Sequence, residues 1–212
     1  MKGPQLLAYS STPSPQLAEI SRANGTQWST AVDMIDENTV INADAEGNLS
    51  IWNRDIALLE SDRERLTYLG GMRLGEMVNQ IRRINSQAQN RLPNTILIPW
   101  AYLATVEGSI YFLAKISDEK TKLLLQLQSN LAQLVCGLGE LSFNRWRGSF
   151  TAATATESPF RVADGNFIQR FLELDDGEAR QVVDGDGGGG MSPLDATVDE
   201  VRNLVESLQM FH

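Results

Sequence analysis

The side chains that most often carry enzyme chemistry are scarce in this sequence. It contains one cysteine, Cys136, in a leucine-rich segment, and one histidine, His212, at its end. A Cys–His or Ser–His–Asp arrangement would need that terminal histidine, and chain ends are seldom ordered. One residue of each type excludes a disulfide framework and a zinc site built from cysteine and histidine. We expect Cys136 to be a small buried apolar residue, and we expect neither a metal nor a cofactor.

Glycine and carboxylate motifs give no stronger case for catalysis. The segment "DGDGGGG" (184–190) lacks the lysine and the serine or threonine that end a phosphate-binding loop. It also lacks the remaining ligands of a calcium loop, so we interpret it as a solvated connection. The adjacent carboxylates Asp175 and Asp176 lie in an acidic region, where such pairs are usually solvated. Because no nucleophile–base pair is evident, we predict a protein that is not an enzyme.

A third motif, "FNRWRGSF" (143–150), places Arg145 and Arg147 on either side of Trp146. Such a segment can grip nucleic acid, or it can pack through the stems of its arginines. Charge favours packing, because residues 157–212 hold 12 acidic and 4 basic residues and the net charge of the chain is −9. Neutralising duplex phosphates requires a basic face, so we expect no strong direct binding to nucleic acid.

The elements that would position these residues fall into two groups. Up to about residue 116, nine short β-branched or aromatic segments alternate with turn residues, as in "TVINAD" (39–44), "AEGN" (45–48) and "NLSIWN" (48–53). This pattern predicts an antiparallel meander. Four-stranded units of this length are typical of β-propeller blades, so residues 1–116 would form about two and a half blades. A closed propeller needs at least about four, so we expect a fragment or a chain that completes a propeller with other polypeptide.

After residue 116 the apolar residues recur with a helical period. Ser117 can cap a helix whose leucines, from Leu124 to Leu138, lie on one face. Shorter helices are predicted after Asp164 and at 177–183, and a capping box at Thr197 opens the last one. The sequence therefore predicts a small α-helical domain at 117–212, following the propeller blades at 1–116.

Membrane segments are not expected. No apolar run approaches the roughly 20 residues that a bilayer requires. The first residues, "MKGPQLLAYSS", hold an apolar run too short for a signal peptide. We therefore expect an intracellular protein without membrane contact.

Seven segments, in one order and spacing, resemble a known family. They are "LLAY" (6–9), "WSTAVDMID" (28–36), "LGEMVN" (74–79), "TVEGSI" (105–110), "LLLQLQSNL" (123–131), "FNRWRGSF" (143–150) and "DGNFIQRFLEL" (164–174). Over nearly its whole length the sequence is similar to the C-terminal end of the cleavage-and-polyadenylation factor A subunit family. The similarity is to its branch of UV-damaged-DNA-binding complexes, and a splicing-factor 3b subunit belongs to the same family.

This resemblance implies an architecture of three propellers and a C-terminal helical domain. The chain would hold the last blades of an incomplete third propeller and the helical domain. The motif "FNRWRGSF" would then belong to the helical domain, with Trp146 and Phe150 as core anchors and with Arg145 and Arg147 packing through their stems and hydrogen-bonding through their heads. Cullin-4 binds the second propeller of the family, so it would be reached only through parts that these residues do not contain.

The resemblance also implies a function and a site. The function would be that of a scaffold or adaptor of a cullin-4-type ubiquitin ligase, linked to DNA-damage repair and located in the nucleus and the cytoplasm. The alternative is a scaffold subunit of a polyadenylation or splicing complex with nucleic-acid association. In the family, WD-repeat substrate receptors insert a helical segment beside the third propeller.

Five positions match that docking pocket: Trp28, Met77, Asn79 and Val106, with Lys2 a weaker match. Tryptophan, methionine and valine offer apolar contact area, and the asparagine can hydrogen-bond backbone at the rim. Trp28 and Val106 could instead be ordinary core residues of the blades.

Overall fold

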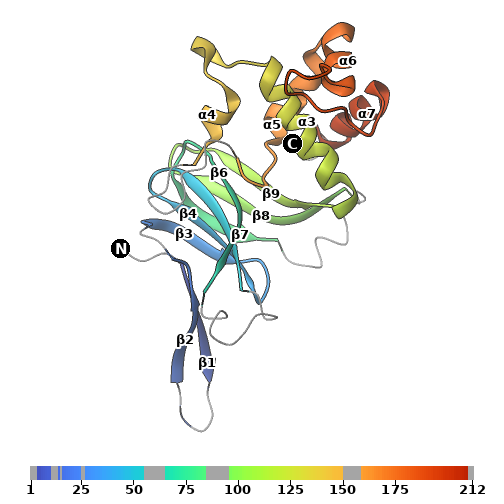
Figure 1. Ribbon diagram of the computed structural model, residues 1–212. Helices are drawn as coiled ribbons and strands as arrows, with labels where there is room; N and C mark the ends of the chain where they lie inside the picture. The colour runs from blue at the N-terminus through green and yellow to red at the C-terminus, as the bar shows by residue number, and fades with distance from the viewer. Residues whose placement is uncertain are drawn as a thin grey trace. The chain divides into compact units, whose positions relative to one another are not determined.

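The computed structural model describes residues 4–10, 14, 16–24, 27–54, 65–84, 96–149 and 159–209. They fall into two compact units. The first, which we call the sheet unit, lies within Met1–Lys115 and Arg147–Phe160, and the second, the helical unit, lies within Ile116–Trp146 and Arg161–His212. Strands fill the first and helices the second (Figure 1).

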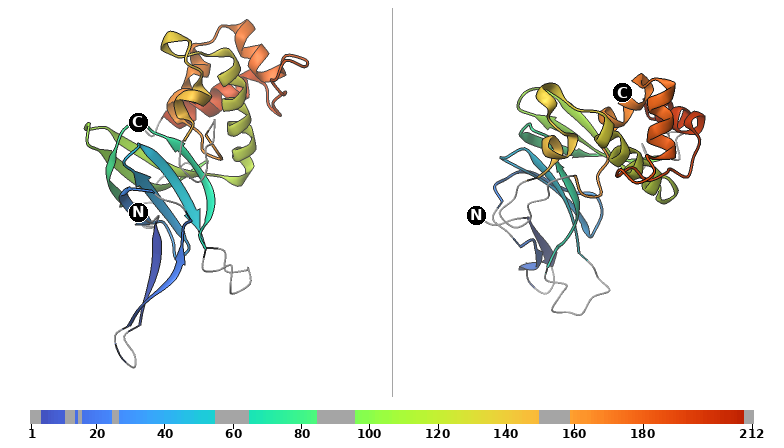
Figure 2. Two further views of the ribbon diagram at one scale, coloured as in Figure 1. Left: turned by 60° about the vertical axis from the view of Figure 1, so that its left-hand side comes forward. Right: turned by 45° about the horizontal axis from the view of Figure 1, so that its top comes forward.

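The strands of the sheet unit form three antiparallel sheets in chain order. A hairpin is made by β1 (Gln5–Ser10) and β2 (Gln16–Arg22); a four-stranded meander by β3 (Ser29–Met34), β4 (Thr39–Asp44), β5 (Asn48–Asn53) and β6 (Thr67–Arg73); and a three-stranded sheet by β7 (Val78–Arg83), β8 (Leu97–Thr105) and β9 (Ile110–Ile116). In the left view of Figure 2, the β1–β2 hairpin projects from the other strands of this unit. The fold class predicted from the sequence, propeller blades followed by a small helical part, agrees with this arrangement.

Side-chain chemistry in the turns explains where the strands reverse. After β4, the carboxylate of Asp44 accepts the backbone N–H of Glu46 and of Asn48, and Gly47 takes a φ of 78°. Before β4, the carboxylate of Asp36 closes the preceding turn in the same way. Aspartate and glycine favour such turns because one caps backbone amides and the other tolerates positive φ.

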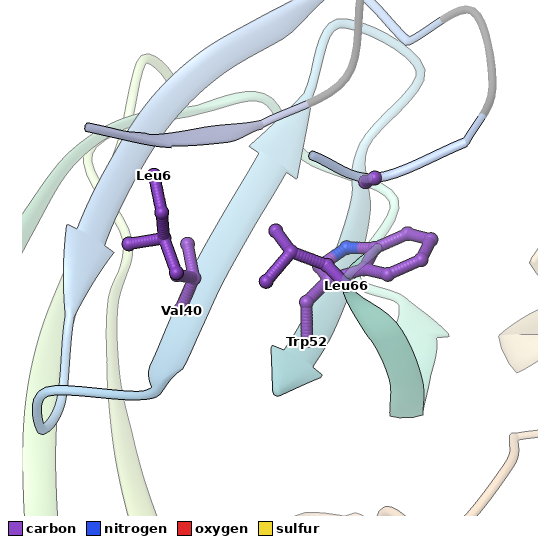
Figure 3. Packing of buried hydrophobic residues seen from close by; sticks show 5 residues of the cluster. Leu6, Val40, Trp52 and Leu66 are labelled. Atoms are coloured by element: carbon purple, nitrogen blue, oxygen red, sulfur yellow. The ribbon is translucent and has the colours of Figure 1, made fainter. Parts of the chain in front are cut away.

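A hydrophobic cluster joins the hairpin to the four-stranded sheet. Its buried members are Leu6, Ala23, Val40, Trp52 and Leu66. Figure 3 shows the side chain of Leu6 close to that of Val40, and Leu66 next to the indole ring of Trp52. Burying each large apolar side chain contributes about 1.5 to 3 kcal/mol, so this cluster stabilises the packing of the hairpin on the four-stranded sheet.

The helical unit contains one long helix and several short ones. They are α3 (Asp118–Leu134), η1 (Leu138–Glu140), α4 (Phe143–Arg147), α5 (Gly165–Ile168), η2 (Gln169–Glu173), α6 (Asp176–Asp184) and α7 (Val198–Gln209). The side chain of Ser117 does not form the predicted cap on α3, the long helix. Asp164 caps α5, Asp175 forms a capping box on α6, and Thr197 and Glu200 form the predicted reciprocal cap on α7. The core is made by residues such as Leu127 and Leu131 of α3, Phe171 of η2, Val182 of α6 and Val205 of α7.

Two sequence-based predictions about the region after α3 are wrong. The helix ends at Leu134 rather than near Leu138, and Gly139 adopts a positive φ of 68°. Cys136 therefore lies beyond the helix, and it is exposed rather than buried.

The motif "FNRWRGSF" also differs from expectation. Trp146 is 45% exposed and is no core anchor, whereas Phe143 is buried and stacks on Phe167 with ring centroids 3.8 Å apart. Phe150 lies outside the described residues. Arg147 is buried, as packing of its stem predicts, but it belongs to the sheet unit. The predicted domain boundary, between residues 116 and 117, stays a prediction. The compact units divide the chain differently, because Arg147–Phe160 belongs to the sheet unit.

Candidate protein-docking edge

Four of the five predicted site residues lie where strands begin or end. Trp28 directly precedes β3, Met77 directly precedes β7, Asn79 is the second residue of β7, and Val106 directly follows β8. Lys2 falls outside the described part of the chain. In an antiparallel pair the start of one strand faces the end of the next, so these positions belong to one edge of the sheets.

Hydrogen bonds bring the start of β3 to the start of β7. The hydroxyl of Thr30 donates to the carbonyl oxygen of Val78 at 2.6 Å and lies 3.3 Å from that of Ala43. The carbonyl oxygen of Trp28 accepts the N–H of Ala45 at 2.9 Å. The segment that carries Trp28 is therefore fixed both to its own sheet and to the neighbouring one.

Two turns meet beside this segment. The carbonyl oxygen of Gly47 accepts the N–H of Leu74 at 2.8 Å and that of Gly75 at 3.3 Å. A side chain at Gly47 would come within 3.1 Å of the backbone nitrogen of Glu76, so glycine permits this close approach. The turn between β4 and β5 is in this way attached to the turn between β6 and β7.

A third turn is tied to the second by Glu76. The hydroxyl of Thr105 donates to its Oε2 at 2.7 Å, and the phenol of Tyr111 donates to its Oε1 at 2.9 Å. The next residue, Met77, accepts the N–H of Val106 at 3.0 Å. We call the surface formed by Trp28, 45–47, 74–77, Asn79 and 105–110 the docking edge.

Hydrogen bonds favour the ionised form of Glu76. Donors at Thr105, Ser109 and Tyr111 hold its pKa below the ordinary value for glutamate, and partial desolvation opposes them. The positive charge of Arg147 adds a smaller lowering of the same pKa. Glu76 is therefore ionised at neutral pH, as a carboxylate that accepts several hydrogen bonds should be.

Arg147 supports the same edge from the motif "FNRWRGSF". Its side chain is only 5% exposed, and Nη1 donates to the carbonyl oxygens of Leu74 at 2.8 Å and Arg73 at 3.2 Å. Sequence reasoning missed both Glu76 and this role of Arg147. The available signal was the glutamate inside "LGEMVN", one residue before a predicted contact residue.

The edge presents apolar side chains to solvent. Trp28 is 65% exposed and Val106 is 51% exposed, so neither side chain is buried by the described strands. Ile110, which was not predicted, is 74% exposed just beyond the same turn. Asn79 is exposed and Met77 is half-buried. Exposed aromatic and aliphatic side chains on a hydrogen-bonded frame are suited to binding another protein.

Other predicted features have structural roles or give no site. Asp175 caps α6, and the carboxylate of Asp176 accepts a hydrogen bond from Arg202 at 2.8 Å, which lowers the pKa of Asp176. Within the described ranges, no three histidine, cysteine or acidic side chains gather closely enough to hold a metal ion. None of the helices in that part of the chain is both long and apolar enough to cross a bilayer.

Known proteins are similar to this sequence over most or all of its length. It matches the CPSF A subunit region family over residues 1–173. DNA damage-binding protein 1 of Oryza sativa subsp. japonica is 31% identical over 215 residues, which cover 100% of this chain and 19% of that protein. DNA damage-binding protein 1 of Schizosaccharomyces pombe is 30% identical over 199 residues, 93% of this chain and 18% of that protein. The chain thus spans about a fifth of the length of these relatives.

The family match confirms the resemblance inferred from the seven sequence motifs. It extends from the strands of the sheet unit to the last residue of η2. The helices α6 and α7 lie beyond it, yet the rice relative aligns with them as well. The chain belongs to the CPSF A subunit region family.

Proposed function

We propose that this chain is part of a scaffold that holds other proteins together. In particular, it would be a segment of an adaptor for a cullin-4-type ubiquitin ligase, linked to DNA-damage repair, that docks WD-repeat substrate receptors. Relatives at about 30% identity bear the name DNA damage-binding protein 1, which supports the link to DNA damage. The observation that carries the proposal is the docking edge, where Trp28 and Val106 are exposed on turns that hydrogen bonds hold in place.

The contact area at this edge is sufficient for a binding hot spot. A tryptophan side chain can bury about 150 to 250 Å² of surface, and 65% of Trp28 remains to be covered. At about 25 cal/mol per Å², covering the exposed part would contribute about 2.5 to 4 kcal/mol. A receptor helix could lay its apolar face along Trp28, Met77 and Val106, while Asn79 hydrogen-bonds its backbone.

Under the same proposal, the chain itself would not contact cullin-4, bind nucleic acid strongly or catalyse a reaction. Cullin-4 would contact other parts of the protein, and receptors would reach this edge. With a net charge of −9, the chain would not bind nucleic acid strongly by itself. It would act in the nucleus, and also in the cytoplasm, without catalysing a reaction.

The test is capture of partners from cells in which the protein is tagged at its own gene. Wild type is compared with Trp28→Ala/Met77→Ala and with a control, Leu17→Ala, whose side chain on β2 is 66% exposed away from the docking edge. We expect WD-repeat proteins with the wild type and the control, and their loss with the double variant. Cullin-4 should be recovered with all three. Undiminished WD-repeat proteins on the double variant would contradict the assigned surface.

A second function is favoured by the family that matches. The family is named for the CPSF A subunit, so a scaffold role in polyadenylation or splicing remains a candidate. Recovery of RNA-processing subunits without cullin-4 in the same experiment would select it.

A further inference from the structure

We propose that Glu76 is the positioning residue of the docking edge: its carboxylate joins the β6–β7 turn to the β8–β9 turn and so fixes Met77 relative to Val106. The consequence for receptor binding rests on the proposed function. The connection between the two turns can be measured without any partner.

One carboxylate spans two strands because each of its oxygens has a different donor. Oε2 accepts from Thr105, the last residue of β8, and Oε1 accepts from Tyr111, the second residue of β9. Two hydrogen bonds to one ionised group fix its orientation as well as its position. Glu76 therefore grips the β8–β9 turn at both of its ends.

The hydroxyl of Thr105 connects Glu76 to the backbone of the β8–β9 turn. It donates to Glu76 and accepts the N–H of Ser109 at 3.0 Å, while the N–H of Thr105 donates to the carbonyl oxygen of Ser109, also at 3.0 Å. Val106 lies between these residues, and its N–H donates to the carbonyl oxygen of Met77. Without Glu76, the hydroxyl would lose its acceptor and the turn would keep fewer restraints.

The residues on the other side of Glu76 are held independently. The N–H of Gly75 donates to Gly47, and the carbonyl oxygen of Leu74 accepts from Arg147. Glu76 thus adds a side-chain connection between two turns that each have backbone hydrogen bonds of their own. Turns are the most variable parts of a sheet protein, and a contact residue that is already ordered loses less entropy on binding. Glu76 would act through Met77 and Val106 rather than by touching the receptor.

The connection should depend on pH in a defined direction. The titratable or charged groups that face the carboxylate are the phenol of Tyr111 and the guanidinium of Arg147, and the hydroxyls of Thr105 and Ser109 do not titrate in this range. Because the pKa of Glu76 is lowered in the folded chain, its contribution is present at and above neutral pH. The contribution is lost as the pH falls through that lowered pKa.

Hydrogen exchange read by mass spectrometry tests the connection in the full chain. Four proteins are compared: wild type, Glu76→Ala, Glu76→Gln, and a control, Glu107→Ala, which removes an exposed carboxylate from the same turn. We expect Glu76→Ala to speed exchange in 74–79 and 103–110 by at least about tenfold, while 40–52 is unchanged. Glu76→Gln should show a smaller rise, since its amide oxygen still accepts one hydroxyl.

Two results of this experiment would overturn the inference. The first is exchange in both turns that stays within about twofold of wild type in Glu76→Ala. The second is a control that loosens the turns as much as Glu76→Ala does. In acid, the protection of the wild-type turns from exchange should fall towards that of Glu76→Ala. If the difference in protection between wild type and Glu76→Ala were the same at all pH values, that would also count against the proposal.

Receptor binding then tests the consequence. The probe is a WD-repeat protein captured by wild type, and its affinity is measured for Glu76→Ala, Val106→Ala and the double variant. If Glu76 acts through Val106, the second substitution should cost less once the first is present. Strictly additive losses, or wild-type affinity in Glu76→Ala, would overturn the positioning role. If no WD-repeat protein binds wild type, the proposed function fails, while hydrogen exchange still decides whether Glu76 joins the turns.

Discussion

Replacing Arg147 with methionine tests whether one buried guanidinium holds the β6–β7 turn. Nη1 donates to the carbonyl oxygens of Leu74 and Arg73 at 2.8 and 3.2 Å. Methionine fills much of the same space but donates no hydrogen bond, so both oxygens lose this donor. A hydrogen bond from a charged donor contributes about 1.5 to 3 kcal/mol, and relief of the desolvation of arginine offsets part of the loss. We expect the free energy of unfolding of the sheet unit to fall by about 2 to 4 kcal/mol.

Hydrogen exchange in β6 and β7 measures this loss. For amides that exchange through unfolding of the unit, a loss of about 2 to 4 kcal/mol in the free energy of unfolding makes exchange about 30- to 1000-fold faster. The matched control is Arg145→Met, which makes the same substitution in the same motif at an exposed side chain. The control should stay within about 0.5 kcal/mol of wild type. Equal effects of the two substitutions, or no measurable effect of Arg147→Met, would refute the reasoning.

Three further substitutions test the packing of each unit. Gly71→Ala should destabilise the sheet unit by at least about 2 kcal/mol in a denaturant titration, because the added methyl group would overlap the carbonyl oxygen of Leu49. A variant as stable as wild type would show that this strand can shift. Asn130→Ala should lower the free energy of unfolding of the helical unit by about 3 kcal/mol in a titration followed by circular dichroism, since Nδ2 of Asn130 donates to the buried carbonyl oxygen of Val182 at 2.7 Å. A loss below about 1 kcal/mol would speak against that role. Thr197→Ala should cost about 1 kcal/mol in the same titration by removing the cap of α7, whereas Thr197→Ser should retain most of the stability.

Strand positions could be predicted because the signals are local. The segments 39–44 and 48–53 match β4 and β5 residue for residue. Asp44 and Gly47 supply the turn between them from within the same few residues. A pattern of alternating side chains bounded by turn chemistry needs no information from the rest of the chain.

Burial after α3 could not be predicted in the same way. Cys136 and Trp146 are apolar types that usually lie inside, but both are exposed. Phe143, a few residues away, is buried because Phe167 provides a stacking partner from a distant segment. Residue type gives an average tendency, and the tertiary neighbour decides the individual case.

The docking edge is also a product of distant contacts. Residues such as Trp28, Met77 and Val106 were placed in one site only through the resemblance, because nothing in their spacing brings them together. Glu76 reaches Thr105 across 29 positions and Tyr111 across 35. Hydrogen bonds over such separations depend on the register of the sheets, which local sequence signals do not specify. Whether receptors use this edge stays a prediction.

The sheet unit has a consequence for the order of events during translation. Arg147 binds the carbonyl oxygen of Leu74 from 73 residues further along, and Phe160 exchanges backbone hydrogen bonds with Gly71 while its ring stacks on Tyr68. The ribosome completes β9 and α3 before it makes either residue. Until then the nascent sheets lack the stacking partner of Tyr68 and the hydrogen bonds that Arg147 donates to the β6–β7 turn. During this period chaperones could bind the exposed surface. A gene fusion or a protease cut after residue 116 would make that unfinished state permanent.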